Sequence, residues 1–162
     1  MLYFAYGSNL NFVRMRERCP STRFECIAVL ERHKLTFPRK SESPKSTFCG
    51  SGVASIEPDD EQNVWGVVYQ IDELDIDRLD KKEGYIPNRE HDKNKYIRCK
   101  RQALRCGDKE SPLTVFTYVA IAQIGGPFLP TQSYMNHILN GAEHWHLPPE
   151  YIAILKQTEI SK

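Results

Sequence analysis

The sequence predicts an α+β fold, a small mixed or antiparallel β-barrel with helices packed on its outside. Segments with strand composition outnumber those with helical composition along the chain. Most of the strand-like segments are joined by links too short to hold a helical crossover, which favours antiparallel pairing in a curled sheet. The alternative is a doubly wound parallel sheet, which needs a regular alternation of strands and helices that this chain lacks.

The chain begins with a strand–turn–helix unit. Residues 2–6 are apolar and aromatic, and Gly7-Ser8-Asn9 stops them, as expected of a buried strand that ends in a turn. Residues 10–18 have helical composition, and Ser8 or Asn9 suits the N-cap of that helix. Cys19-Pro20 then ends the helix.

Strand-like segments follow, separated by a polar loop and an acidic turn. Residues 39–50 are rich in Ser, Lys and Pro, which is typical of an exposed loop. The acidic stretch 57–61 is expected to turn the chain. The strands are expected at residues 24–30, 33–38, 52–56 and 64–71, of which the last gives the strongest signal.

The second half of the chain opens with a helix. Asp72 is expected to be its N-cap, with Leu74, Ile76 and Leu79 facing inward and Gly84 near its end. The elements expected after it are a polar loop at residues 84–95, strands at 96–104 and 113–121, and helices at 131–142 and 148–158.

Length and charge limit the class of protein. A chain of 162 residues fits one domain, so residues 1–162 are expected to share a single core. The 22 Lys and Arg residues nearly balance the 21 Asp and Glu residues, which gives a net charge of +1. This balance gives no reason to expect nucleic acid, an anionic membrane or a strongly acidic protein as a partner.

The sequence also indicates a compartment. The N-terminus lacks the features of a signal peptide, and no stretch approaches the ~18 apolar residues that a membrane helix needs. The five cysteines are odd in number and never fall in C-x-x-C spacing. Such cysteines are an awkward disulfide set for a secreted protein but ordinary thiols in a reducing cytosol. We therefore expect a cytoplasmic protein.

The turn at Gly7 is the first candidate site. A turn that leads into a helix leaves backbone N–H groups without intrahelical partners, and the helix dipole adds partial positive charge there. Such a nest binds a carboxylate, a phosphate or a developing oxyanion. An ordinary capped turn has the same residue types, and residues 7–10 match neither a phosphate loop nor a nucleophile elbow.

Glu83 is the second candidate. It is expected at the C-terminal end of a helix, where the dipole disfavours the charged form of a carboxylate. If Glu83 is also buried, it becomes a proton carrier near neutral pH. The alternative is a solvated glutamate at a helix end.

No metal or cofactor is expected. His144 and His146 are two residues apart, a spacing that does not place both imidazoles on one helical face. No cysteine has the local signature of an activated nucleophile, although a Cys–His pair stays open. Tyr118 is expected in a core strand, where its hydroxyl needs a buried partner, either a protein group or a ligand.

Together these segments resemble the γ-glutamylcyclotransferase superfamily, which includes γ-glutamylamine cyclotransferases and AIG2-like proteins. The resemblance covers nearly the whole chain. The motifs that carry it, in the family's order, are Tyr3–Leu10 (YFAYGSNL), Trp65–Val68 (WGVV), Leu79–Gly84 (LDKKEG), Phe116–Tyr118 (FTY) and Leu147–Tyr151 (LPPEY).

The resemblance implies intramolecular aminolysis. The substrate's own α-amine attacks its γ-glutamyl carbonyl, which forms 5-oxoproline and releases an amino acid or amine, so the enzyme needs no nucleophile, metal or cofactor. Glu83 is the implied acid–base catalyst, and the backbone around Gly7 and Ser8 holds the substrate carboxylate or carbonyl oxygen. The implied substrate-binding residues are Tyr3, Phe4, Ala5, Tyr6, Gly7, Ser8, Asn9 and Tyr118.

The segment 85–95 departs from the family pattern, because it is longer and more charged. Loops beside a pocket set leaving-group preference, so the substrate stays open among a γ-glutamyl dipeptide, a γ-glutamylamine and a γ-glutamyl group on a larger molecule. The resemblance also leaves a homodimer open. The alternative function is a non-catalytic module that binds a small carboxylate on the same fold.

Overall fold

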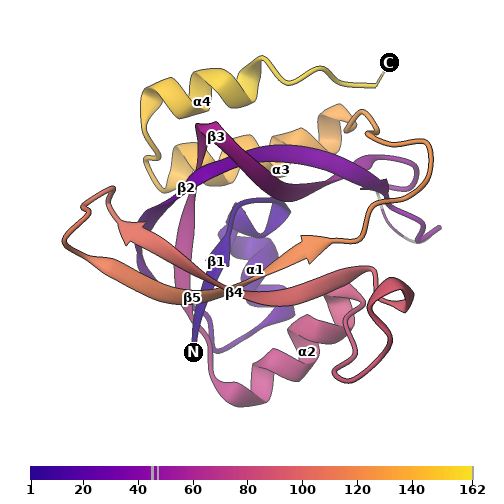
Figure 1. Cartoon of the computed structure of the whole chain (residues 1–162), viewed down its shortest axis with the longest axis horizontal. Coiled ribbons are helices and arrows are strands. Elements are labelled where there is room, and N and C mark those ends of the chain that lie inside the picture. Colours follow the sequence, from indigo (N-terminus) through magenta and orange to yellow (C-terminus); the bar gives the residue numbers. More distant parts are fainter. Residues whose placement is uncertain (45, 47, 162) are drawn as a thin grey trace.

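The computed structural model describes residues 1–44, 46 and 48–161. Within these residues, five strands close into a barrel in the order β1-β3-β2-β4-β5 (Figure 1). The predicted barrel is therefore confirmed. The strands are β1 Leu2–Ala5, β2 Arg23–Lys40, β3 Gly52–Gln70, β4 Tyr96–Arg105 and β5 Pro112–Ala120.

The barrel is mixed because it closes through one parallel contact. All other neighbouring strands are antiparallel, whereas β1 runs parallel to β5 with Tyr3 opposite Phe116. The short first strand is thus placed between β3 and β5. Its C-terminal end carries the turn at Gly7, so barrel closure fixes the position of that turn.

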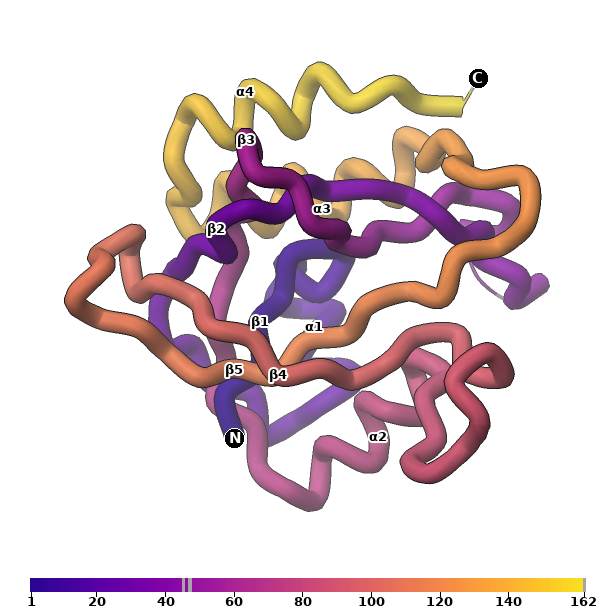
Figure 2. The backbone as a smooth tube through the Cα atoms, viewed as in Figure 1, coloured from indigo at the N-terminus to yellow at the C-terminus, as the bar shows by residue number. Residues whose placement is uncertain are grey.

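The strands β2 and β3 are longer than predicted and form one continuous ribbon (Figure 2). The predicted turn between residues 30 and 33 is a bulge inside β2, where Arg32 has a φ of 54°. The predicted acidic turn at residues 57–61 is also wrong, because this stretch lies within β3. The amine of Lys34 pairs with the Glu57 carboxylate at 3.0 Å across the ribbon, so acidic residues here are cross-strand partners.

The first helix begins later than predicted. Ser8–Leu10 form a short 3₁₀ turn, and helix α1 spans Phe12–Arg18. Its N-cap is Asn11, whose side-chain oxygen accepts a hydrogen bond from the Arg14 amide at 3.1 Å, rather than Ser8 or Asn9. Ser8 and Asn9 are therefore left for the site rather than for helix capping.

Helix α2 spans Glu73–Glu83, with Asp72 at its N-cap position but no cap bond from that side chain. Gly84 ends the helix with a φ of 68°, the left-handed conformation that glycine adopts without strain. Ile76 and Leu79 face the core as predicted, but Leu74 is 89% exposed. Asp75 and Asp80 are buried instead, so the inward face of α2 carries two carboxylates.

The remaining helices are α3, Gln132–His144, and α4, Pro149–Lys156, and a 3₁₀ turn at His91–Lys93 lies in the loop after α2. Figure 1 shows α3 and α4 on one side of the barrel and α2 on the opposite side. In the described part of the chain, no helix is both long and apolar enough to cross a membrane. Side chains that are almost fully buried in the core include Phe4, Leu10, Met15, Val67, Tyr69 and Leu79.

Candidate active site

A small inner pocket of about 30 Å³ lies at the end of β1. Most of the residues predicted for the site meet there, although they come from β1, the turn after it, α2 and β5. Phe4 and Ala5 do not line it, because Phe4 is fully buried in the core and Ala5 pairs with Val67 of β3. The lining residues are Tyr3, Tyr6, Gly7, Ser8, Asn9, Ala54, Glu83, Tyr96, Tyr118 and Tyr134.

The turn at Gly7 lines this pocket and leaves two backbone donors without a protein acceptor in the described part of the chain. The Gly7 and Ser8 carbonyls accept hydrogen bonds from the amides of Leu10 and Asn11, at 2.9 and 3.2 Å. No described residue accepts a hydrogen bond from the amides of Gly7 and Ser8 themselves. A Cβ on Gly7 would lie 3.1 Å from the Ala54 side chain, so a larger residue would crowd the pocket wall.

Glu83 stands at the mouth of the pocket as the last residue of α2. One carboxylate oxygen, Oε1, accepts hydrogen bonds from Arg18 at 2.6 Å and from the side-chain amide of Asn9 at 3.2 Å. The Glu83 side chain is 14% exposed. The guanidinium of Arg18 offsets the unfavourable interaction between the Glu83 carboxylate and the C-terminal end of the helix dipole.

Tyr3 extends this hydrogen-bonded network. Its hydroxyl accepts a hydrogen bond from the side-chain amide of Asn9 at 2.9 Å. Burial, followed by the nearby charge of Glu83, raises the pKa of Tyr3 far above its ordinary value. The Tyr3 hydroxyl therefore stays protonated and keeps its own hydrogen available for a group in the pocket.

Tyr118 is held by a partner within the protein. Its hydroxyl donates to Asp80 Oδ1 at 2.6 Å, and Arg98 donates to Asp80 Oδ2 at 3.0 Å. Burial raises the pKa of Asp80 above its ordinary value. The hydrogen bond from Tyr118 and the charge of Arg98 oppose this rise without cancelling it. The hydrogen of the Tyr118 hydroxyl is thus committed, and only its lone pairs face other partners.

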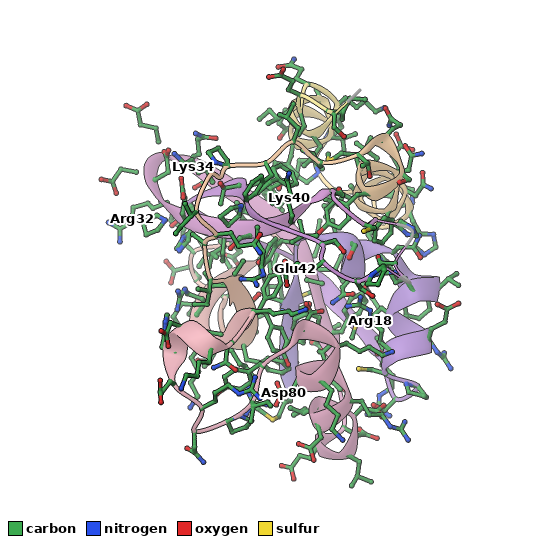
Figure 3. The ribbon with its side chains drawn as sticks, turned by 90° about the vertical axis from the view of Figure 1, so that its right-hand side faces the viewer. Arg18, Arg32, Lys34, Lys40, Glu42 and Asp80 are labelled. Carbon is green, nitrogen blue, oxygen red and sulfur yellow. The ribbon has the colours of Figure 1, made fainter. Side chains whose placement is uncertain are left out.

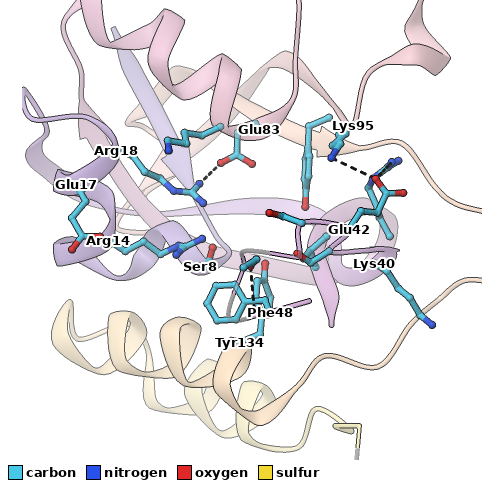
Figure 4. Close-up of a pocket in the computed structure, with 17 residues that line it drawn as sticks. Ser8, Arg14, Glu17, Arg18, Lys40, Glu42, Phe48, Glu83, Lys95 and Tyr134 are labelled. Carbon is cyan, nitrogen blue, oxygen red and sulfur yellow. Dashed lines mark hydrogen bonds and ion pairs between the residues drawn. The ribbon is translucent and has the colours of Figure 1, made fainter. Parts of the chain in front are cut away.

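An outer cleft of about 430 Å³ continues from the inner pocket (Figure 4). Ser8, Glu83, Tyr96 and Tyr134 line both spaces, so the inner pocket opens into the cleft. Figure 3 labels two residues of the cleft, Arg18 of α1 and Glu42 of the loop after β2. The charged residues of the cleft are Arg14, Glu17, Arg18, Arg39, Lys40, Glu42, Lys82, Glu83 and Lys95.

Other chemistry lacks support among the described residues. No group of three or more His, Cys, Asp or Glu side chains is placed to hold a metal ion in this part of the chain. Burial raises the pKa of the Cys19 thiol to about 12, so Cys19 is not a thiolate at neutral pH.

Sequence reasoning missed Arg14, Arg18 and Asp80. The two arginines are four residues apart, so they lie on one face of α1, and that spacing is a usable signal. Asp80 is three residues before Glu83 on α2. Nothing in the sequence identified α1 as the source of the Arg18 partner of Glu83, or β4 and β5 as the source of the partners of Asp80.

The geometry is that of a small-molecule site, with a carboxylate between an enclosed nest of amides and an open charged cleft. The fold is that of a solved γ-glutamyl cyclotransferase, with a TM-score of 0.84, 30% identity, and coverage of 100% of this chain and 89% of that one. A glutathione-specific γ-glutamyl cyclotransferase from yeast shares the fold at a TM-score of 0.66 and 14% identity.

The sequence comparisons identify the family. The model of the AIG2-like family matches residues 63–155. The γ-glutamylcyclotransferases of Homo sapiens and Mus musculus are each 33% identical over 158 residues, which are 98% of this chain and 78% of theirs. The chain belongs to the AIG2-like family of the γ-glutamylcyclotransferase superfamily, and the resemblance drawn from its motifs is confirmed.

Proposed function

We propose that this protein is a γ-glutamyl cyclotransferase that converts a γ-glutamyl amino acid or amine to 5-oxoproline and the free amino acid or amine. The observation that carries the proposal is the position of Glu83. Its carboxylate lines both the inner pocket, where the Gly7 and Ser8 amides have no protein acceptor, and the outer cleft. One group is thereby placed to exchange protons with both the attacking and the leaving nitrogen.

The γ-glutamyl part of the substrate occupies the inner end of the site. The Gly7 and Ser8 amides hold its carboxylate or carbonyl oxygen, and the tyrosine walls exclude water. Bringing the α-amine onto the γ-carbonyl orders a flexible chain, and such alignment lowers the barrier by several kcal/mol, on the order of 7 for a well-oriented pair. Tyr118 supports this wall from β5, with its hydroxyl fixed by Asp80.

The reaction proceeds by proton transfers through Glu83. The carboxylate takes a proton from the α-ammonium, and the freed amine attacks the γ-carbonyl carbon to form a ring. The oxyanion of the tetrahedral intermediate accepts hydrogen bonds from the backbone nest at Gly7 and Ser8. As the carbonyl re-forms, the bond to the leaving nitrogen breaks and Glu83 returns its proton to that nitrogen. The ring nitrogen then passes its second proton through Glu83 to the released amine, which leaves a neutral ring amide, and no water molecule is consumed.

Arg18 and Asn9 keep Glu83 ready for the first of these steps. Both donate to Oε1, and no described residue donates to Oε2. The second oxygen is therefore free to accept the ammonium proton. An ionised carboxylate is also the form that a general base needs before the substrate binds.

The setting of the activity belongs to the same proposal. We place the protein in the cytoplasm, because its cysteines lack a disulfide pattern and burial holds Cys19 and Cys26 as thiols. Its partner is a small γ-glutamyl molecule rather than nucleic acid or a membrane, in keeping with a net charge of +1. A homodimer is compatible with this activity.

The test compares Glu83→Gln with the native protein on a panel of γ-glutamyl dipeptides and γ-glutamylamines. Glu83→Gln removes the proton carrier but keeps the shape of the side chain, so we expect turnover about 10²- to 10⁴-fold lower at an unchanged melting temperature. The matched control is Glu73→Gln, an exposed residue of the same helix. Chromatography of 5-oxoproline measures the product.

Full activity of Glu83→Gln would remove Glu83 from the mechanism. A native protein that forms no 5-oxoproline, yet melts at a higher temperature with a γ-glutamyl compound, would identify the alternative, a binding module on this fold.

A further inference from the structure

The outer cleft is where the leaving part of the substrate lies, if the inner pocket holds the γ-glutamyl part. This step rests on the proposed function. The inner pocket of about 30 Å³ has room for the carboxylate or carbonyl oxygen of the γ-glutamyl part, and the cleft of about 430 Å³ has room for the rest of the substrate, its variable half included. The chemistry of the cleft lining therefore bears on which leaving groups the enzyme accepts.

Basic residues dominate this lining. Six Lys and Arg side chains face three Glu side chains among the described residues of the cleft. Two of the carboxylates already pair within the protein, because Glu83 binds Arg18, and Glu42 lies 3.5 Å from both Arg39 and Lys95. The surplus of positive charge favours an anionic molecule.

Arg14 is the basic residue whose environment is least satisfied. Its Nε is buried without a hydrogen-bond partner, and no described carboxylate lies within ion-pair distance of its guanidinium. The guanidinium lies over the Phe48 ring, 5.0 Å from its centroid, and Figure 4 shows it reaching from α1 toward Ser8. Burial, followed by the charge of Arg18, lowers the pKa of Arg14.

This arrangement has a direct physical consequence. A half-buried guanidinium without a counter-charge is unfavourable, and an anion beside it removes that cost. The planar fork of arginine binds a carboxylate through two parallel hydrogen bonds, and the stacked aromatic ring fixes the plane of the fork. Arg14 lines the cleft but not the inner pocket, so it faces the leaving half.

We propose that Arg14, held over Phe48, is the binding site for a carboxylate on the leaving group. The enzyme then prefers γ-glutamyl amino acids and γ-glutamyl peptides, whose leaving parts carry a carboxylate, over γ-glutamylamines that lack one. Arg14 makes this choice through binding and takes no part in the proton transfers at Glu83.

The experiment uses two substrates that differ at one group, γ-glutamylalanine and γ-glutamylalaninamide. The native protein should show a kcat/KM about 10- to 100-fold higher for the acid, the factor expected of a hydrogen bond to a charged group. Arg14→Met should lower kcat/KM for the acid by this factor and leave the carboxamide nearly unchanged. Arg14→Lys should fall between, because it keeps the charge without the fork.

Arg16→Met is the matched control. Arg16 is an exposed residue of the same helix that lies near Phe12 and does not line the cleft. It should leave both substrates unaffected, and a melting temperature for each variant checks the fold.

The outcomes separate the subsite from the reaction. Equal turnover of both substrates by the native protein, or an equal loss on both in Arg14→Met, overturns the leaving-group subsite while the proposed function stands. If neither substrate yields 5-oxoproline, the proposed function fails, and calorimetry then decides on the subsite. Tighter binding of the acid than of the carboxamide, lost in Arg14→Met, supports the subsite, and equal binding overturns it.

Discussion

Tyr118 and Arg98 hold the buried carboxylate of Asp80, and this triad positions the end of α2. Asp80 is only 3% exposed, and it accepts from Tyr118 of β5 and from Arg98 of β4. A carboxylate at that depth is tolerated because both of its oxygens are hydrogen-bonded. Glu83 lies three residues further along α2, on nearly the same face, so the triad also fixes where the Glu83 carboxylate stands.

Removing the Tyr118 hydroxyl should therefore affect both stability and turnover. Tyr118→Phe leaves Asp80 Oδ1 buried without its donor, and we expect a free energy of unfolding lower by about 1–3 kcal/mol. We expect kcat to fall by about tenfold or more, because a shift of the helix end misplaces Glu83. Urea denaturation and 5-oxoproline formation measure the two effects.

The control for this prediction is Tyr85→Phe. Tyr85 lies beside Arg98, whose guanidinium is 5.5 Å from its ring centroid, but its hydroxyl has no hydrogen-bond partner among the described residues. Its loss should change neither quantity. Unchanged stability and kcat in Tyr118→Phe would show that Arg98 alone positions Asp80.

At the scale of elements, the site depends on how helices pack against the turn after β1. Helix α3 packs on the 3₁₀ turn Ser8–Leu10, and Gly141 of α3 lies against Leu10. A Cβ at Gly141 would lie 2.4 Å from the Leu10 carbonyl carbon. The glycine is required here for space, and its contact sets the distance between α3 and the backbone nest.

Local sequence signals predicted the existence of most elements but not their continuity. The bulge at Arg32 and the acidic stretch 57–61 have turn-like composition, yet cross-strand pairs such as Lys34 with Glu57 keep both within the ribbon. Leu74 was wrongly predicted to face inward. The prediction rested on its apolar side chain, but its position on α2 faces solvent. These features depend on partners that are distant in sequence.

The candidate site likewise combines residues that sequence motifs identified with residues that they did not. Gly7 and Glu83 belong to contiguous motifs, and the family resemblance of those motifs singled them out, because their residue types alone also fit an ordinary turn and a solvated glutamate. Arg14 and Arg18 are significant only because α1 packs where α2 ends and Phe48, which lies between β2 and β3, lines the same cleft. Their four-residue spacing places both arginines on one face of α1, but no local pattern shows that this face lines the cleft.

Gly141→Ala should displace the nest through a change in packing alone. Overpacking of this contact is expected to lower the free energy of unfolding by about 1–3 kcal/mol, as in other crowded cores. Turnover should fall as well, because the Gly7 and Ser8 amides move with Leu10. Thermal unfolding and steady-state kinetics provide the measurements.

Asn140→Ala is the comparison, since it places the same new residue one position earlier on the exposed face of α3. Alanine has the higher helix propensity, so this variant should be neutral or slightly stabilised. A Gly141→Ala protein with native stability and activity would mean that α3 can shift without moving the turn.

At the scale of the whole molecule, the barrel joins segments from the whole length of the chain. The first strand lies between β3 and β5, with Tyr3 opposite Phe116. Near the C-terminus, the Ser161 amide donates to the Pro130 carbonyl, and Trp145 stacks on Phe24 of β2 with ring centroids 4.4 Å apart. Each half contributes a strand pair of its own, but the barrel closes only where β1 meets β5 and β2 meets β4, and α3 packs on the turn Ser8–Leu10, so neither half retains a complete core.

We therefore predict that residues 1–162 unfold as one cooperative unit. Trp65 lies in β3 and Trp145 follows α3, so tryptophan fluorescence reports on the barrel and on its helical side, while far-ultraviolet circular dichroism reports on all elements. The two urea transitions should coincide, as expected of a single domain of this size. A γ-glutamyl ligand should move both midpoints together, because binding at the α1, α2 and β1 junction stabilises the entire barrel. Separate transitions, or a ligand effect on one probe alone, would divide the chain into two independently folding parts and place the site in only one of them.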